Sequence, residues 1–131
     1  MIESKYMRNL FVKILVCCLA LLCVSCFKEV DLGYPAKITF SKAGGEKVVT
    51  GKRSFTHAAI QDYKGNEGET IIAADGKRYN VYDWLWVENE ELYYEELKVY
   101  AAPNTTGKRR TLYIELYSGP EYQVVTVKQG K

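Results

Sequence analysis

The strongest constraint on the fold is the alternation of apolar and polar residues near the end of the sequence. In residues 112–117, Leu or Ile alternates with Tyr or Glu, and Val125 and Val127 repeat the pattern within residues 122–129. A period of two residues places one face of a strand in a core. Ser118-Gly119-Pro120 between the two runs is typical of a turn. We therefore predict an antiparallel strand pair, with Leu112, Ile114, Val125 and Val127 in the core.

Shorter strand patterns precede this pair, and each ends at a turn signal. Residues 36–40 alternate cleanly, and Gly51 is expected to end the short run at 48–50. Residues 92–97 fit a helical turn as well as a strand, and we place the strand from about Glu95. Short strands with frequent turns are typical of an antiparallel β-sandwich. The remaining predicted strands are 55–60, 70–74, 77–81, 84–87 and 95–101.

Asp75-Gly76 is the clearest turn signal in the domain. A two-residue Asp-Gly connection favours a type I′ hairpin, so residues 70–74 are predicted to pair with residues 77–81. That register places Ile72 opposite Tyr79 and Ile71 opposite Asn80.

The first 25 residues have the layout of a secretory signal peptide. A basic start is followed by 11 apolar residues from Ile14 to Val24 and by the small Ser25. A spanning helix needs roughly 20 apolar residues, so residues 1–25 are predicted to be cleaved. We expect residues 26–33 to be a tether and residues 34–131 to be one domain.

Cys26 stands where the apolar run gives way to polar sequence. Ser25-Cys26 resembles the lipobox of bacterial lipoproteins, although Cys23 occupies the position that is often Leu. The resemblance implies that Cys26 becomes the first mature residue and carries acyl chains. We therefore expect an outer-membrane lipoprotein of the cell envelope. The domain could lie on the cell surface or on the inner face of the outer membrane. The alternative is an unmodified Cys after an ordinary signal.

Charge and composition argue against several classes of function. Residues 26–131 contain equal numbers of basic and acidic side chains, so they lack the surplus of basic residues that nucleic-acid binding normally needs. His57 is the single His and no Cys follows Cys26, which makes a transition-metal site improbable. No residue set indicates catalysis or a cofactor. The acidic stretch 62–69 lacks the EF-hand spacing, so a calcium site is not predicted there.

Several residues resemble the pattern of the BACON domain family. They are Phe40, Gly44-Gly45, Val48-Val49, Trp84-Leu85, Val87, Val99, Asn104, Arg110-Thr111, Val125, Val127, Gln129 and Gly130. The resemblance covers most of residues 36–130 and implies an immunoglobulin-like β-sandwich of about seven strands. It also implies a module that binds carbohydrate or mucin, or a spacer. Family position makes Trp84 a core residue and Arg110 a residue that closes the loop after Asn104.

Exposed aromatic rings are the best candidates for ligand contact, because flat rings cover the apolar face of a sugar. Eleven of the 131 residues are Tyr. Trp86 is expected to be more exposed than Trp84, and packing across strands is the alternative role for these rings. The candidate ligand-binding residues are Trp86, Tyr93, Tyr94, Tyr113, Tyr117 and Tyr122.

Two functions are compatible with these features. The first is a lipid-anchored module that recognises a polysaccharide or a mucin-type glycoprotein, with binding that depends on Trp86 and Tyr117. The second is a structural or assembly subunit that contacts an envelope protein. Lys108-Arg109-Arg110 is the single basic cluster and could contact phosphate or a sulfated glycan.

Overall fold

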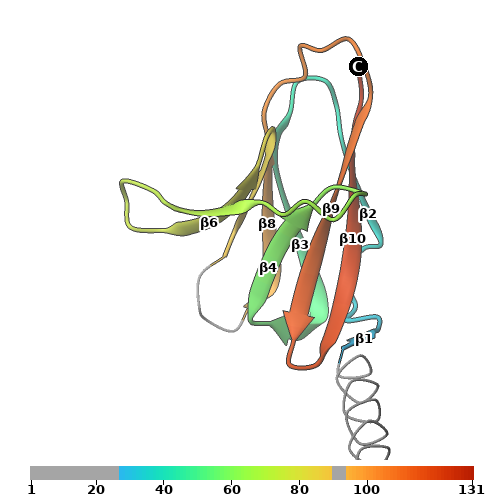
Figure 1. Ribbon diagram of the computed structural model, residues 1–131, viewed down its shortest axis with the longest axis vertical. Helices are drawn as coiled ribbons and strands as arrows, with labels where there is room; N and C mark the ends of the chain where they lie inside the picture. The colour runs from blue at the N-terminus through green and yellow to red at the C-terminus, as the bar shows by residue number, and fades with distance from the viewer. Residues whose placement is uncertain (1–26, 90–93) are drawn as a thin grey trace, which may run out of the picture.

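The computed structural model describes residues 27–89 and 94–131, in which two five-stranded sheets face each other (Figure 1). Sheet A contains β1 (Lys28–Glu29), β2 (Lys37–Phe40), β4 (His57–Gln61), β9 (Arg110–Ser118) and β10 (Glu121–Gln129). Sheet B contains β3 (Gly45–Phe55), β5 (Glu69–Ile72), β6 (Arg78–Tyr82), β7 (Leu85–Glu88) and β8 (Tyr94–Ala101). The prediction of an all-β sandwich is confirmed.

Sheet A is mixed rather than fully antiparallel. The described residues form ten strands where about seven were expected, and β1 and β2 both pair in parallel with β10. The predicted pair is present, with Val125 opposite Ile114 and Val127 opposite Leu112. The difference arises because residues 28–40 add two short strands along the outer edge of β10.

The segment expected to be a tether is built into the fold. Leu32 is fully buried, and Tyr34 is buried beside it. Gln123 Oε1 accepts hydrogen bonds from the Leu32 and Tyr34 amides at 2.9 and 3.3 Å, and Gln123 Nε2 donates to the Tyr34 carbonyl at 2.8 Å. Polar backbone in a core needs such partners, so this Gln fixes the chain soon after Cys26, which lies outside the described residues.

Gly51 does not end its strand, contrary to expectation. β3 continues to Phe55, with a shift in its pairing to β8 between Thr50 and Phe55. A Cβ atom at Gly51 would lie 2.3 Å from the Tyr34 ring. The glycine therefore provides space for that ring. After Phe55 the chain crosses to sheet A and begins β4 at His57.

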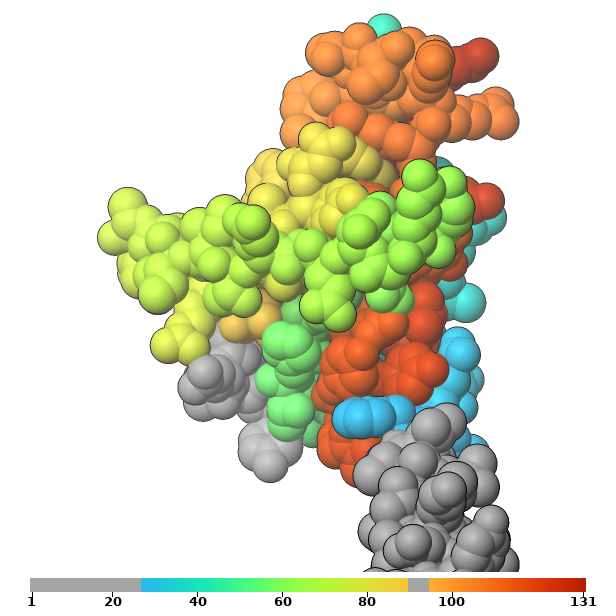
Figure 2. Space-filling model, viewed as in Figure 1, coloured from blue at the N-terminus to red at the C-terminus, as the bar shows by residue number. Residues whose placement is uncertain are grey.

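The hairpin around Asp75-Gly76 forms, but its predicted register is wrong by one residue. Ile71 pairs with Tyr79 and Ile72 with Arg78. The Ala73 amide donates to the Lys77 carbonyl, which leaves a three-residue loop with Gly76 at φ 84°. Gly in the last position of such a loop is typical of a turn with a bulge. β5 and β6 extend beyond the rest of the sandwich (Figures 1 and 2).

The core lies between the two sheets. The five predicted core residues are all buried, with Trp84 5% exposed. Trp84 and Trp86 share strand parity but have different surroundings, because β7 begins at Leu85 and Trp84 precedes it after Asp83, whose φ is 50°. The buried residues named from the sequence are Trp84, Leu112, Ile114, Val125 and Val127.

Two buried asparagines connect the sheets at the free edge of β4. Asn80 Oδ1 accepts the Ile60 amide at 2.8 Å, and Asn89 Oδ1 accepts the Ala58 amide at 2.9 Å. Both Asn residues come from the sheet B side of the sandwich. They supply the acceptors that a further strand would otherwise provide.

We expect Asn80→Ala to lower the free energy of unfolding by about 1–3 kcal/mol, because it leaves the buried Ile60 N–H without an acceptor. Thr70→Ala is the matched control, since Thr70 is exposed directly opposite Asn80 and its loss should change stability by less than about 0.5 kcal/mol. Urea unfolding of both variants measures the difference. Equal losses would contradict the bridging role of Asn80.

None of the described residues forms a helix long and apolar enough to cross a membrane.

Candidate functional site

The candidate ligand-binding residues lie on opposite faces of the sandwich and do not form one site. Trp86 points outward from sheet B, whereas Tyr113, Tyr117 and Tyr122 point outward from sheet A. Tyr93 lies outside the described residues, and Tyr94 starts β8 but its side chain also lies outside them. One small ligand cannot contact Trp86 and Tyr117 together, because the sandwich core separates them.

An aromatic surface on sheet B, which we call the Trp86 face, contains Trp86, Tyr100 and Tyr79. Trp86 pairs with Tyr100 across β7 and β8, and their rings are stacked with centroids 5.8 Å apart and planes 7° apart. Tyr79 meets Tyr100 edge-on at 6.1 Å. All three side chains are partly exposed. The three rings form a partly exposed aromatic cluster at the centre of the sheet.

Charged groups border the Trp86 face on the same outer surface. Glu88 pairs with Lys77 at 3.3 Å and with Lys98 at 3.5 Å, and it lies between Tyr79 and Lys98 in the sheet register. The hydrogen bond to Glu88 is the largest cause of a raised pKa of Lys77. These ion pairs place carboxylate and ammonium groups beside the aromatic rings. Val48 and Ile71, 48% and 46% exposed, flank this border.

Burial is the main cause of a raised pKa of Tyr100. The phenol therefore remains protonated at neutral pH. Its hydroxyl is therefore a neutral hydrogen-bond donor on this surface.

A second aromatic row lies on the outer face of sheet A. Tyr117 contacts Tyr122 at 5.7 Å and His57 at 5.9 Å, with ring planes tilted by 35° and 34°. Phe27 meets Tyr117 edge-on at 6.2 Å. None of these three pairs of rings is parallel, in contrast to Trp86 and Tyr100. The row lies beside Phe27, one residue after Cys26.

The polar groups in this row form hydrogen bonds with other groups of the protein. Glu115 accepts hydrogen bonds from the Tyr117 hydroxyl and from the Gln61 amide. Burial first, and this carboxylate second, raise the pKa of Tyr117 well above its usual range. The Asn89 amide lies 3.3 Å from His57 Nδ1. These contacts favour a structural role for the row.

Arg110 has the loop-closing position that the family resemblance implied. Its guanidinium lies 4.7 Å from the centre of the Trp84 ring. Its Nε donates to Gln129 Oε1 at 2.8 Å, and its Nη2 lies 3.3 Å from the carbonyls of Ala102 and Pro103. The arginine therefore covers the buried tryptophan and binds the loop that follows β8.

The acidic loop after β4 is organised by Asp62 through hydrogen bonds within the protein. Its carboxylate accepts from the Asn66 side chain at 2.8 Å, the Tyr82 hydroxyl at 2.8 Å, and the Asn66 and Lys64 amides at 2.9 Å. The Asn66 side chain is the largest cause of a lowered pKa of Asp62, about 2. In the described part of the chain, no group of three or more His, Cys, Asp or Glu side chains could hold a metal ion.

We expect the Asp62 carboxyl to titrate near pH 2 in the folded protein. Because its folded pKa is lower than the unfolded value of about 3.9, the stabilisation is complete above pH 3.9 and is lost as the pH falls through 2. Carboxyl carbon shifts measured against pH give the midpoint. Tyr82→Phe should raise it, and an Asp62 midpoint of 4 in the unsubstituted protein would contradict these contacts.

Sequence reasoning missed Tyr79 and Tyr100 as partners of Trp86. Strand parity placed Tyr100 with Lys98 on the polar side of β8, which is the outer face. The missing information was the register that brings β6, β7 and β8 together.

The fold and the Trp86 face define a small β-sandwich domain with a partly exposed aromatic cluster on one sheet. The model of the BACON family, described as "Putative binding domain, N-terminal", matches residues 64–130. The chain belongs to the BACON family.

Two solved structures are similar to this chain at low sequence identity. A protein from Bacteroides thetaiotaomicron, determined by NMR, is 16% identical with a TM-score of 0.50, over 74% of this chain and 81% of that chain. A Bacteroides ovatus GH5 xyloglucanase in complex with a XXXG heptasaccharide is 15% identical with a TM-score of 0.47, over 72% of this chain and 17% of that chain. No curated protein matches the chain.

Proposed function

We propose that this protein is a lipid-anchored recognition module of the cell envelope and that its Trp86 face binds glycan or glycoprotein without catalysis. The observation that carries the proposal is the parallel pair of rings, Trp86 and Tyr100, on the outer surface of sheet B. Paired aromatic rings offer a broad apolar surface with little conformational entropy to lose on binding. Membership of a family described as a binding domain supports a contact function.

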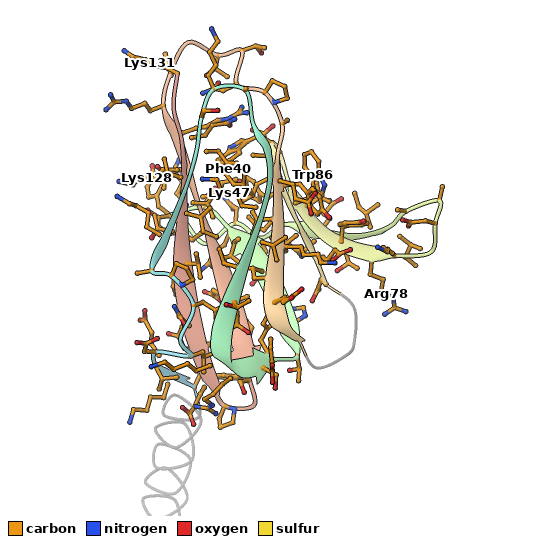
Figure 3. All side chains as sticks on the ribbon, turned by 180° about the vertical axis from the view of Figure 1, so that it is seen from behind. Phe40, Lys47, Arg78, Trp86, Lys128 and Lys131 are labelled. Atoms are coloured by element: carbon orange, nitrogen blue, oxygen red, sulfur yellow. The ribbon has the colours of Figure 1, made fainter. Side chains whose placement is uncertain are left out.

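The proposed attachment is through acyl chains on Cys26. It places the protein in the outer membrane as a lipoprotein. The chain is fixed in the fold from β1 onward, so a lipid on Cys26 would hold the domain close to the membrane surface. The Trp86 face lies away from β1 along the sandwich (Figure 3). A soluble or surface polysaccharide could therefore reach it.

We expect Trp86→Ala to abolish glycan binding and Tyr117→Ala to leave it unchanged, because the two rings lie on opposite sheets. A glycan array that includes mucin, plant and host glycans measures this. The free energy of unfolding of both variants must first be shown to lie within about 1 kcal/mol of that of the unsubstituted domain. Loss of binding in Tyr117→Ala alone would place the site on sheet A, and a blank array with normal folding would refute the glycan ligand.

A structural or assembly role in an envelope complex is the second candidate, and the β5–β6 hairpin favours it. β5 is the edge strand of sheet B, and Ile71 and Ile72 are 46% and 65% exposed on it. Exposed apolar edge strands are sites where another chain can pair. Ile72→Lys should prevent the recovery of a specific crosslinked partner if this role holds, while glycan binding at Trp86 would persist.

A further inference from the structure

Three segments at one end of sheet A carry basic residues and no acidic ones. The segments 34–45, 101–114 and 122–131 contain seven Lys and Arg residues and no Asp or Glu. The charge of the chain is close to neutral overall, so this concentration is a local feature of the fold. The basic residues are Lys37, Lys42, Lys108, Arg109, Arg110, Lys128 and Lys131.

Asn104 and the end of β10 bring the three segments together. The Asn104 amide donates to the Lys42 carbonyl at 2.7 Å, and its side chain donates to the carbonyls of Lys108 and Gly130 at 2.7 and 2.8 Å. The Gly130 amide donates to the Phe40 carbonyl at 3.0 Å. Because Asn104 is buried, these hydrogen bonds fix the positions of the three segments relative to one another.

A cleft of about 310 Å³ opens on this surface. In the sheet register, Lys128 lies between Thr39 of β2 and Thr111 of β9, and Lys37 lies opposite Thr126. Lys37 and Lys128 are therefore diagonal neighbours on the outer face of sheet A. The side chains that the argument uses are Lys37, Thr39, Arg109, Thr111 and Lys128, all of which line the cleft.

Four cationic side chains line the cleft. One of them is bonded within the protein, and three have no carboxylate partner in the described part of the chain. Arg110 is bonded to Gln129 and to two carbonyls of the loop after β8. Among the described residues, no carboxylate pairs with Lys37, Arg109 or Lys128. Other cations of the domain do have such partners, including Arg53 with Glu121 and Lys98 with Glu88.

Three like charges around one cleft repel one another unless an anion enters. A guanidinium binds an oxyanion through two parallel hydrogen bonds, and an ammonium binds it as a point charge. The hydroxyls of Thr39 and Thr111 add neutral donors and acceptors beside Lys128. The cleft is near the lower limit of small-molecule sites, so it fits one sugar unit of a chain that continues into solvent.

We propose that this cleft binds the sulfate or carboxylate groups of an acidic polysaccharide. The site is on the sheet opposite to the Trp86 face, and Figure 3 shows Lys128 and Trp86 on opposite sides of the sandwich. β1 pairs with Glu121 and Tyr122 at the start of β10, whereas Lys37 and Lys128 lie along its second half. A membrane held at Cys26 would therefore lie toward the β1 end of β10 and away from the cleft, which favours a polysaccharide over anionic lipid headgroups.

The test compares dextran sulfate with unsulfated dextran of the same length, because the two polymers differ only in their anionic groups. We expect the full domain to bind the sulfated polymer and not the neutral one. The double variant Lys37→Gln/Lys128→Gln should bind at least about tenfold more weakly, since two charge-assisted hydrogen bonds are lost. The control Lys52→Gln/Lys64→Gln removes the same charge outside the cleft and should stay within about twofold.

Three results would overturn the proposal. Equal weakening in the two double variants would indicate attraction by net charge alone, and equal binding to both polymers would remove the role of the anion. Binding to phosphatidylglycerol vesicles that depends on Lys37 and Lys128, without binding to the polymer, would assign the cleft to lipid. Trp86→Ala should not change binding to dextran sulfate, so failure of this site and failure of the Trp86 face are distinguishable.

Discussion

Trp84→Ala is expected to lower the free energy of unfolding by about 3–5 kcal/mol, the range for deleting a large buried aromatic side chain. Trp84 is 5% exposed and packs in the core directly before β7. The same substitution removes the ring over which the Arg110 guanidinium lies at 4.7 Å. A domain of this size has a total stability of about 5–15 kcal/mol, so the loss is a large fraction of it.

Trp86→Ala is the matched control for this prediction. It deletes the same side chain two residues away, but from a partly exposed position on the outer face of sheet B. The expected loss is much smaller, because little buried volume becomes empty. Chemical denaturation followed by far-UV circular dichroism avoids the change in tryptophan fluorescence. Equal losses in the two variants, or a larger loss for Trp86→Ala, would refute the assignment of Trp84 to the core.

Cys26→Ser is expected to release the protein completely from the membrane fraction of a bacterial host. Burial of an acyl chain contributes about 0.8 kcal/mol per methylene, so two or more chains give stable attachment. Serine cannot form the thioether that carries them. Cys23→Leu is the control, because it removes a neighbouring thiol, supplies the residue that is often found at this lipobox position and leaves Cys26 intact.

Metabolic labelling with a radioactive fatty acid, followed by membrane fractionation, measures the effect of Cys26→Ser. We expect label in the unsubstituted protein and in Cys23→Leu, and none in Cys26→Ser. A protein that carries no label and stays with the membrane in all three forms would show that another contact holds it there.

Much of the fold was predictable because its strands bury one face each. The alternation at residues 112–117 and the valines at 125 and 127 predicted the β9–β10 pair, and the structure has the paired registers that alternation requires. Parallel pairing of β1 and β2 with β10 was not predictable, since these strands are four residues long or shorter and their partner is far along the chain.

The errors at Gly51 and Asp75-Gly76 have local physical causes. Gly51 was expected to end a strand, but the glycine is required by the ring of Tyr34, which is distant in sequence. Asp75-Gly76 fits both two-residue and three-residue loops, and the chain adopts the longer one, which shifts the register by one residue. Sequence patterns do not contain either contact.

The candidate site was predictable residue by residue but not as a surface. Trp86 was identified because the family pattern placed Trp84 in the core. Tyr79 and Tyr100 lie beside Trp86 because β6, β7 and β8 are neighbours in sheet B. Tyr117 and Tyr122 are not part of this face because β9 and β10 belong to the other sheet. Which strands share a sheet decides the composition of a binding face, and alternation along one strand does not determine that.

The most direct test of the Trp86 face is a two-dimensional amide NMR titration of the domain with a neutral oligosaccharide identified on the array. We predict that the shifted amides cluster in β6, β7 and β8, around residues 79–81, 86–88 and 98–100, and that the Trp86 indole N–H shifts with them. Amides of β9 and β10 at 113–117 and 122–126 should stay in place. Shifts confined to those two strands, with the Trp86 indole unchanged, would contradict the account.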